Sequence, residues 1–199
     1  MKYKILRRII LSSSFFFLLF TLRLPLSFGL PAEDVQVVTD AQYFQMAKKM
    51  IHEAKHSVRV MMFEMGYYDK YPNTPSNLLV RELIDARKRG AGVEVILEVK
   101  EGEDRTTKRN RHTGKILSDG GVKVIYDSPL KTTHAKFMVV DGELSLLGST
   151  NWTYYALTNN NEASVLVRSK EVARALLEYF NRVKAAGNKN SKFEAPISK

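Results

Sequence analysis

A histidine and a lysine stand two residues apart in the stretch His134-Ala135-Lys136, at the entrance to an apolar segment. Alternate residues of a strand point to the same face of a sheet, so the imidazole and the ammonium are expected to project together. Such a pair suits a phosphate ester, because the ammonium neutralises phosphate charge while the imidazole attacks phosphorus or transfers a proton. The pair therefore predicts phosphate chemistry.

The residues that follow are expected to bring further polar groups beside this pair. Asp141-Gly142 is the dipeptide most typical of a tight hairpin, and it separates two short apolar runs. The second run ends in Gly148-Ser149-Thr150-Asn151, which the hairpin returns toward His134. Gly148 permits a close backbone approach, and the Ser149 hydroxyl and Asn151 amide can donate hydrogen bonds to phosphate oxygens.

A carboxylate completes the set. Glu162 opens the next predicted strand. By analogy with the third member of a catalytic triad, its carboxylate is expected to hold the second ring nitrogen of His134.

These motifs together resemble the signature of the phospholipase D superfamily. The resemblance lies in His134-x-Lys136-x-x-x-x-Asp141, then Gly148-Ser149-x-Asn151 and Asn161-Glu162, and it extends over roughly residues 35–185. Within this superfamily the sequence resembles small members with one copy of the motif, the bacterial periplasmic endonucleases and the mitochondrial cardiolipin hydrolase.

The resemblance implies a role for each motif residue. His134 is the nucleophile and forms a covalent phosphohistidine. Lys136, Ser149 and Asn151 bind the phosphoryl oxygens, and Glu162 orients His134. Asp141 and Gly148 are structural parts of the motif.

The resemblance also implies a homodimer. Family members use two histidines, but none of His52, His56 and His112 is followed two places later by lysine. The second histidine is then expected from a two-fold partner, with the active site at the interface. No metal and no cofactor is expected in this chemistry, since lysine and hydrogen-bond donors supply the charge stabilisation.

Composition points to a polyanionic substrate. The 199 residues hold 31 Lys+Arg against 21 Asp+Glu and no cysteine. The missing cysteine excludes disulfides, thiolate nucleophiles and cysteine-based zinc sites. Five of the basic residues lie in residues 1–29, which hold no acid, so the remainder carries only about +5. Nucleic acid and acidic lipid headgroups both fit this charge.

Two surface features remain open in interpretation. A basic cluster is either a track for a phosphate backbone or a solvated helix face; its members are Arg105, Lys108, Arg109, Arg111, His112 and Lys115. The tyrosine-rich loop 67–71 is predicted to rim the active-site cleft or to touch a membrane. Trp152, Tyr154 and Tyr155 can stack on bases or contact lipid, but packing against the sheet is the preferred interpretation.

The N-terminus is typical of a signal peptide. Four basic residues precede the mostly apolar run Ile9–Leu22, and Ser27-Phe28-Gly29 supplies small residues for cleavage. The run of 14 residues is shorter than the roughly 20 needed to cross a bilayer. We expect an exported protein, periplasmic or secreted; the alternative is a membrane anchor formed by residues 1–29. Residues 30–187 form the predicted catalytic domain and residues 188–199 a polar tail.

The predicted fold is α/β, a mixed and mostly parallel sheet sandwiched by helices. The predicted activity is a metal-independent phosphodiesterase, with a nonspecific endonuclease acting on DNA or RNA as the first choice. A phospholipase D that cleaves phosphatidylcholine or cardiolipin is the alternative, and a non-catalytic nucleic-acid or lipid binding module is the second alternative.

Overall fold

One seven-stranded sheet carries the motif residues, on its strands or on the segments that directly flank them. The computed structural model describes residues 29–102 and 104–190, and the elements in this part belong to the unit Pro31–Lys199. The strands are β1 (Asp34–Thr39), β2 (Ser57–Met62), β3 (Gly92–Leu97), β4 (Lys123–Tyr126), β5 (Lys136–Val140), β6 (Leu144–Gly148) and β7 (Ala163–Arg168). The helices are α2 (Gln42–Glu53), α3 (Pro75–Lys88), α4 (Arg105–Asp119), α5 (Tyr154–Thr158) and α6 (Lys170–Asn190).

The sheet is mixed, with strand order β1-β7-β6-β5-β2-β3-β4. Strands β2, β3 and β4 pair in parallel, as the alternation of strands and helices in this half predicts. The pairs of β2 with β5, β5 with β6, β6 with β7 and β7 with β1 are antiparallel. The expectation of a mostly parallel sheet was therefore wrong, because the hairpin and the strands added beyond it reverse direction at each step.

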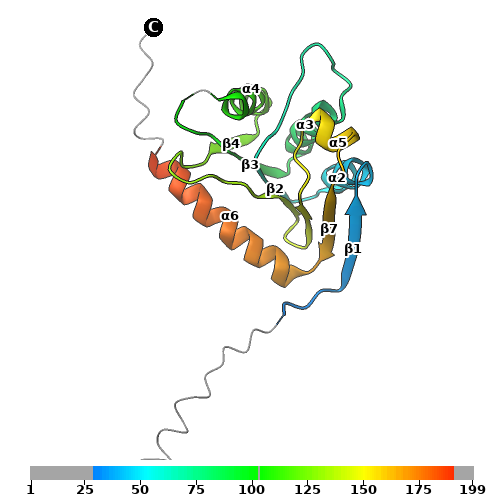
Figure 1. Cartoon of the computed structure of the whole chain (residues 1–199). Coiled ribbons are helices and arrows are strands. Elements are labelled where there is room, and N and C mark those ends of the chain that lie inside the picture. The colour runs from blue at the N-terminus through cyan, green and yellow to red at the C-terminus, as the bar shows by residue number, and fades with distance from the viewer. Residues whose placement is uncertain (1–28, 103, 191–199) are drawn as a thin grey trace, which may run out of the picture. The chain divides into compact units, whose positions relative to one another are not determined.

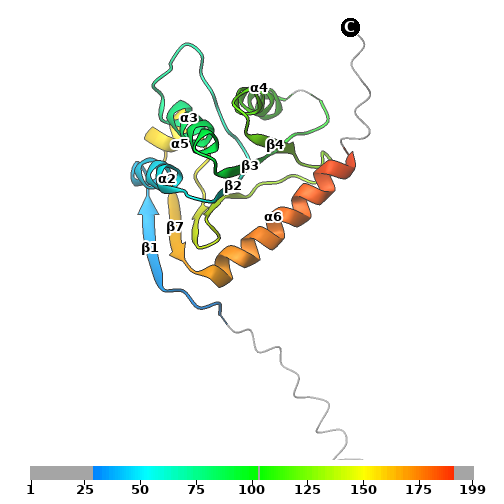
Figure 2. The same cartoon turned by 180° about the vertical axis from the view of Figure 1, so that it is seen from behind.

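Helices cover both faces of the sheet (Figures 1 and 2). On one face α2, α3 and α4 close the larger core, which includes Ile51, Leu83 and Leu117. On the other face α6 packs through Phe180 against residues such as Met61 and Ile96, the inward side chains of β2 and β3. Strands β2 and β3 thus bury alternate side chains on opposite faces, and the predicted helix–sheet–helix arrangement is confirmed.

Two helix boundaries and one whole helix differ from what the sequence predicts. The polar stretch 100–109 predicts a flexible loop, but helix α4 begins within it at Arg105, because the Asp104 carboxylate accepts a 2.7 Å hydrogen bond from the Thr107 amide. Helix α5 was not predicted, and Thr153 caps it. Helix α6 continues to Asn190, so residues 188–190 of the predicted tail are helical.

Candidate active site

The hairpin of β5 and β6 brings the two halves of the motif together. Asp141 and Gly142 both adopt positive φ, 52° and 67°, as a tight two-residue turn requires. Gly148 pairs with Ser164 of β7 so closely that a Cβ would lie 2.2 Å from the Ser164 hydroxyl oxygen and 2.5 Å from a backbone oxygen. Glycine is therefore required there, as the sequence predicts.

The Asp141 carboxylate ties the hairpin to the beginning of β2. It accepts backbone hydrogen bonds from Lys55, His56 and Ser57 at 2.9, 2.8 and 2.7 Å. These donors lower the pKa of Asp141, although partial burial acts in the opposite direction. The aspartate thus fixes the register of β5 against β2, which is a structural role.

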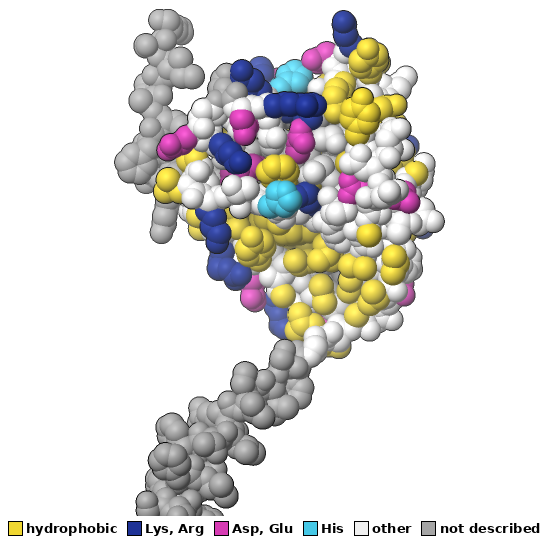
Figure 3. All heavy atoms as spheres, viewed as in Figure 1, with side chains coloured by type: hydrophobic (Ala, Val, Ile, Leu, Met, Phe, Trp, Pro, Cys, Tyr) yellow, Lys and Arg dark blue, Asp and Glu magenta, His cyan; other side chains and the backbone are white. Residues whose placement is uncertain are grey.

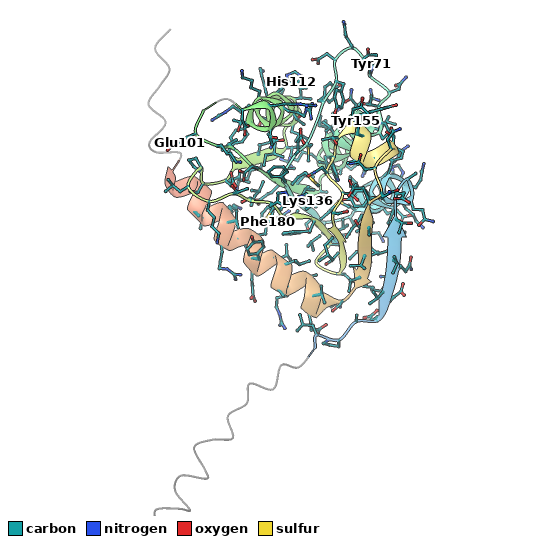
Figure 4. The ribbon with its side chains drawn as sticks, in the orientation of Figure 1. Tyr71, Glu101, His112, Lys136, Tyr155 and Phe180 are labelled. Atoms are coloured by element: carbon teal, nitrogen blue, oxygen red, sulfur yellow. The ribbon has the colours of Figure 1, made fainter. Side chains whose placement is uncertain are left out.

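His134 and Lys136 lie in contact at the opposite end of the hairpin. The Lys136 ammonium is 3.2 and 3.3 Å from the two ring nitrogens of His134 and donates a 2.7 Å hydrogen bond to its carbonyl oxygen. Lys136 is 8% exposed, whereas His134 is exposed to solvent. The structure thus presents the imidazole at the surface, with the cation directly behind it (Figure 4 labels Lys136).

The surroundings favour a neutral imidazole. Partial burial and the positive charges of Lys136 and Lys100 lower the pKa of His134 below its usual value. Burial lowers the pKa of Lys136 as well, while the negative charge of Glu162 opposes that change. Only an unprotonated imidazole has a lone pair for attack on phosphorus, so this environment suits a nucleophile.

Phe63 supports both residues, and sequence reasoning missed it. Its ring centroid is 4.5 Å from that of His134 and 4.8 Å from the Lys136 ammonium. The segment is held by Asn110 of α4, whose buried amide donates to the Phe63 carbonyl oxygen at 2.8 Å. Phe63 directly follows β2 in a strongly apolar run, and nothing in that pattern distinguishes it from a core residue.

Glu162 does not hold His134 as expected. In the described part of the chain no hydrogen bond joins the two; the carboxylate accepts instead from Ser149 Oγ and, at 3.1 Å, from Asn160. Its backbone N–H donates to Asp40 at 2.9 Å. The Ser149 hydroxyl, which donates to this carboxylate, also accepts a 3.1 Å hydrogen bond from the Ala163 amide. The predicted hydrogen bond between Glu162 and His134 is therefore not formed among the described residues.

Asn151 lies on a segment anchored in the core. Its side-chain oxygen is buried and has no hydrogen-bond partner among the described residues. The next residue, Trp152, is fully buried and donates a 3.1 Å hydrogen bond to the Tyr43 hydroxyl. Packing of Trp152 is as predicted, but Tyr154 and Tyr155 are 41% and 64% exposed, so their predicted packing was wrong.

A pair of buried carboxyl groups lies behind the loop that leads to His134. Glu98 and Asp127 are 1% and 3% exposed. Glu98 accepts a 2.5 Å hydrogen bond from the Thr133 amide, and Asp127 accepts one of 2.9 Å from the Val99 amide. Burial and the proximity of Asp127 raise the pKa of Glu98 to about 8. The sequence offered no signal for this pair, since the two residues are far apart in the chain.

The described residues hold neither a cluster of metal ligands nor a membrane-spanning helix. Across residues 29–102 and 104–190, no group of three or more His, Asp or Glu side chains is placed to hold a metal ion. In the same part of the chain, no helix is long and apolar enough to cross a membrane. The predicted leader, residues 1–29, lies almost wholly outside the described residues and stays a prediction.

Comparison with known proteins assigns the class. Residues 47–184 match the family described as "Cardiolipin synthase, PLD-like domain", which is more than half of the chain. The chain belongs to this family and thus to the phospholipase D superfamily. The sequence resemblance and the predicted α/β class are confirmed.

Individual curated relatives are similar to parts of the chain. It is 37% identical over 68 residues to mitochondrial cardiolipin hydrolase of Canis lupus familiaris, covering 34% of this chain and 27% of that protein. The Xenopus laevis protein of the same name is 28% identical over 145 residues, covering 73% of this chain and 62% of the relative. The chain thus spans less than two thirds of the length of these curated relatives.

Solved structures show the same fold. Nuc from Salmonella typhimurium, a phospholipase D family member, superimposes with a TM-score of 0.65 at 24% identity, covering 77% of this chain and 95% of Nuc. NucT from Helicobacter pylori gives a TM-score of 0.59 at 16% identity, covering 77% and 98%.

Proposed function

We propose that this protein hydrolyses phosphodiester bonds through a covalent phosphohistidine on His134, without a metal ion. The observation that carries the proposal is the exposed imidazole backed by a buried ammonium, with Lys136 at 3.2 Å from His134 Nδ1. An environment that lowers the imidazole pKa keeps the nucleophile unprotonated, and the fixed ammonium meets the phosphoryl charge without reorganisation.

The reaction has two steps. In the first, the imidazole lone pair of His134 attacks phosphorus, the bond to the leaving oxygen breaks, and His134 of the partner subunit gives that oxygen a proton. In the second, a water molecule attacks phosphorus and breaks the phosphorus–nitrogen bond. The partner's His134, neutral after the first step, now takes a proton from that water. This restores the neutral nucleophile and the protonated partner histidine.

A homodimer supplies the second histidine in this scheme, and an uncovered apolar surface supports it. Val35 and Val37 of the edge strand β1 are 58% and 72% exposed, and Val37 pairs with Val165 of β7. Figure 3 shows hydrophobic side chains gathered over the region where Figure 1 places β1 and β7. This surface adjoins Glu162, because the Asp40 amide that follows β1 donates to the Glu162 carbonyl oxygen at 3.0 Å.

Introducing one charged side chain into this apolar surface tests the dimer. Val37→Asp should convert a sedimenting dimer to a monomer and abolish activity together, because each site then lacks its proton donor. Arg174→Glu changes the charge of an exposed residue on α6 and should alter neither. A fully active monomeric Val37→Asp variant would overturn the two-histidine scheme.

Nucleic acid is the first-choice substrate, in keeping with the basic balance of the chain, and a phospholipid is the second candidate. The relatives named mitochondrial cardiolipin hydrolase, at up to 37% identity, favour the lipid.

We further propose that the protein is exported, which rests on the pattern of residues 1–29. N-terminal sequencing of the protein from fractionated cells tests cleavage and location.

The deciding experiment incubates the purified protein with plasmid DNA, RNA, and phosphatidylcholine or cardiolipin vesicles, all in EDTA. Nicking without lipid turnover supports the nuclease, and phosphatidate release supports the lipase. With a substrate that carries a labelled phosphorus atom, the label should be trapped covalently on the wild-type protein. It should be absent from the His134→Ala variant. Activity that EDTA abolishes and magnesium restores would refute the metal-independent mechanism, and binding without any turnover would indicate the non-catalytic module.

A further inference from the structure

A cleft lined by aromatic side chains lies beside the candidate active site. Its volume is about 730 Å³, within the roughly 300–1,000 Å³ typical of ligand sites. We call it the tyrosine cleft; its defining residues are Tyr68, Tyr71, Tyr154, Tyr155, Arg105 and Arg109. The tyrosine-rich loop and the basic helix, which the sequence presents as separate features, thus line one cavity.

The rings are available to a ligand. Tyr71 and Tyr155 are 65% and 64% exposed, and Tyr154 meets Tyr155 edge to face at 5.5 Å. Figure 4 shows Tyr71 and Tyr155 on the side of the ribbon away from α6 and Phe180. Grouped exposed aromatic rings are a common mark of a binding surface rather than of a surface that only faces water.

The backbone that carries the rings is also held in place before any ligand arrives. The fully buried Asn77 accepts a 2.9 Å hydrogen bond from the Tyr68 amide and donates to the carbonyl oxygens of Tyr68 and Tyr71 at 3.0 and 3.2 Å. The Tyr68 hydroxyl accepts a 3.1 Å hydrogen bond from the Tyr154 amide, which joins the two tyrosine-bearing segments. A preformed site loses little conformational entropy on binding.

The cleft and the catalytic pair share their two supporting segments. Glu64 lines the cleft and directly follows Phe63, which contacts His134. Backbone hydrogen bonds join this segment to the one after Asn151: the Trp152 amide donates to the Glu64 carbonyl oxygen at 3.0 Å, and the Gly66 amide donates to that of Trp152 at 2.7 Å. One extended ligand can therefore reach both places.

The charge in the cleft suits a second phosphate. Arg109 forms an ion pair with Glu64 and lies over the Tyr68 ring at 5.7 Å, so its charge is compensated. Arg105 is exposed, and no carboxylate among the described residues pairs with it. A phosphate next to the scissile one is the group that this free guanidinium would attract.

We propose that the tyrosine cleft is a stacking subsite for an unpaired base of single-stranded nucleic acid, with Arg105 facing a neighbouring phosphate. The inference rests on the proposed phosphodiesterase function and deepens it. Aromatic rings stack on the face of a base, and in a duplex the neighbouring base pairs cover that face. An acyl chain would favour aliphatic walls, whereas these walls carry tyrosine and threonine hydroxyls and an ion pair.

Anisotropy of a fluorescent thymidine oligonucleotide tests the subsite, in a His134→Ala background so that the strand stays intact. Tyr71→Ala and Tyr155→Ala should each weaken binding by about 10-fold, and Tyr155→Phe, which keeps the ring, should restore it. Arg105→Ala should reduce the slope of log K against log salt by about 0.7, while Arg174→Ala on α6 should not. A blunt duplex should respond far less to the tyrosine variants.

A parallel measurement separates this proposal from the function on which it rests. Bis(p-nitrophenyl) phosphate is too small to span both places, so the proposed chemistry predicts its hydrolysis in EDTA by the enzyme with His134 intact. No hydrolysis would count against the proposed function itself. If hydrolysis occurs but the tyrosine variants bind the oligonucleotide as tightly as their parent, the stacking subsite is refuted. Variants that lose binding to cardiolipin vesicles and keep oligonucleotide binding would refute it too, and would assign the cleft to lipid.

Discussion

Removal of the Asp141 carboxylate should destabilise the fold while sparing the chemistry. Three backbone N–H groups donate to it at 2.7–2.9 Å, and each such bond contributes about 1 kcal/mol net. The residue also has φ 52°, where alanine incurs about 1 kcal/mol or more of strain that aspartate and asparagine tolerate better. Asp141→Ala should therefore lower the free energy of unfolding by about 4 kcal/mol.

Urea and thermal unfolding measure this change. For a chain of this size, about 2–4 °C is lost per kcal/mol, so Tm should fall by about 8–16 °C. Asp141→Asn keeps one oxygen acceptor and should lose about half as much. Glu143→Ala removes a carboxylate from the same hairpin whose ion pair with Arg168 is solvent-exposed, and it should cost less than about 1 kcal/mol.

The pH dependence of the free energy of unfolding should also report the role of Asp141. The pKa of Asp141 is lower in the folded protein than its usual value, so its contribution is complete above that value and is lost as pH falls through the folded pKa. Wild type and Asp141→Ala should converge in stability on acidification. Equal stability of the two at neutral pH would refute the anchoring role. Loss of turnover by orders of magnitude in a fully folded Asp141→Ala would instead make the carboxylate catalytic.

Three further predictions follow from contacts in and behind the site. Gly148→Ala should destabilise by about 3 kcal/mol in urea unfolding, because the new Cβ meets the backbone of β7; a neutral effect would show that the strands separate easily. Lys100→Ala should raise the pKa of His134 and move the acid limb of kcat/KM to higher pH, and an unmoved limb would contradict the charge effect. The pKa of Glu98 is raised to about 8, so the folded protein favours the protonated form of this carboxyl group. The free energy of unfolding should therefore decline as the pH rises from the usual pKa of a glutamate through 8. Glu98→Gln, which mimics that form, should flatten the decline, and a parallel pH profile would contradict the prediction.

Backbone-level features were the ones that the sequence could predict. Strand alternation places His134 and Lys136 together, and the Asp141-Gly142 dipeptide predicts the turn, because both depend on local geometry. The contact of Glu162 was predicted wrongly because it depends on side-chain rotamers across two strands. No rule of sequence spacing determines those rotamers. The partnership of Glu98 with Thr133 joins segments 35 residues apart in a buried setting, so composition and periodicity carry no trace of it.

The beginning of helix α4 was predicted wrongly for a different reason. Its first turns consist of polar residues, and polarity alone predicted a flexible loop over residues 100–109. One face of the helix is nevertheless buried: Thr107 and Asn110 are 1% and 0% exposed and hydrogen-bond to the strand ends beside the site. Small polar residues that satisfy buried backbone groups resemble loop residues in any hydropathy pattern.

The hydrogen bond of Trp152 to Tyr43 means that substitutions near Asn151 and substitutions in the tyrosine cleft should have different consequences in evolution. The segment that carries Asn151 is fixed from inside the core, whereas the cleft rings sit on exposed positions of a loop and a short helix. With the proposed stacking role of these rings, substitutions at the outer positions would alter which ester is accepted while leaving the chemical step and the hydrophobic interior undisturbed. A scaffold divided in this way can diversify its specificity by single surface mutations, without a compensating change in stability.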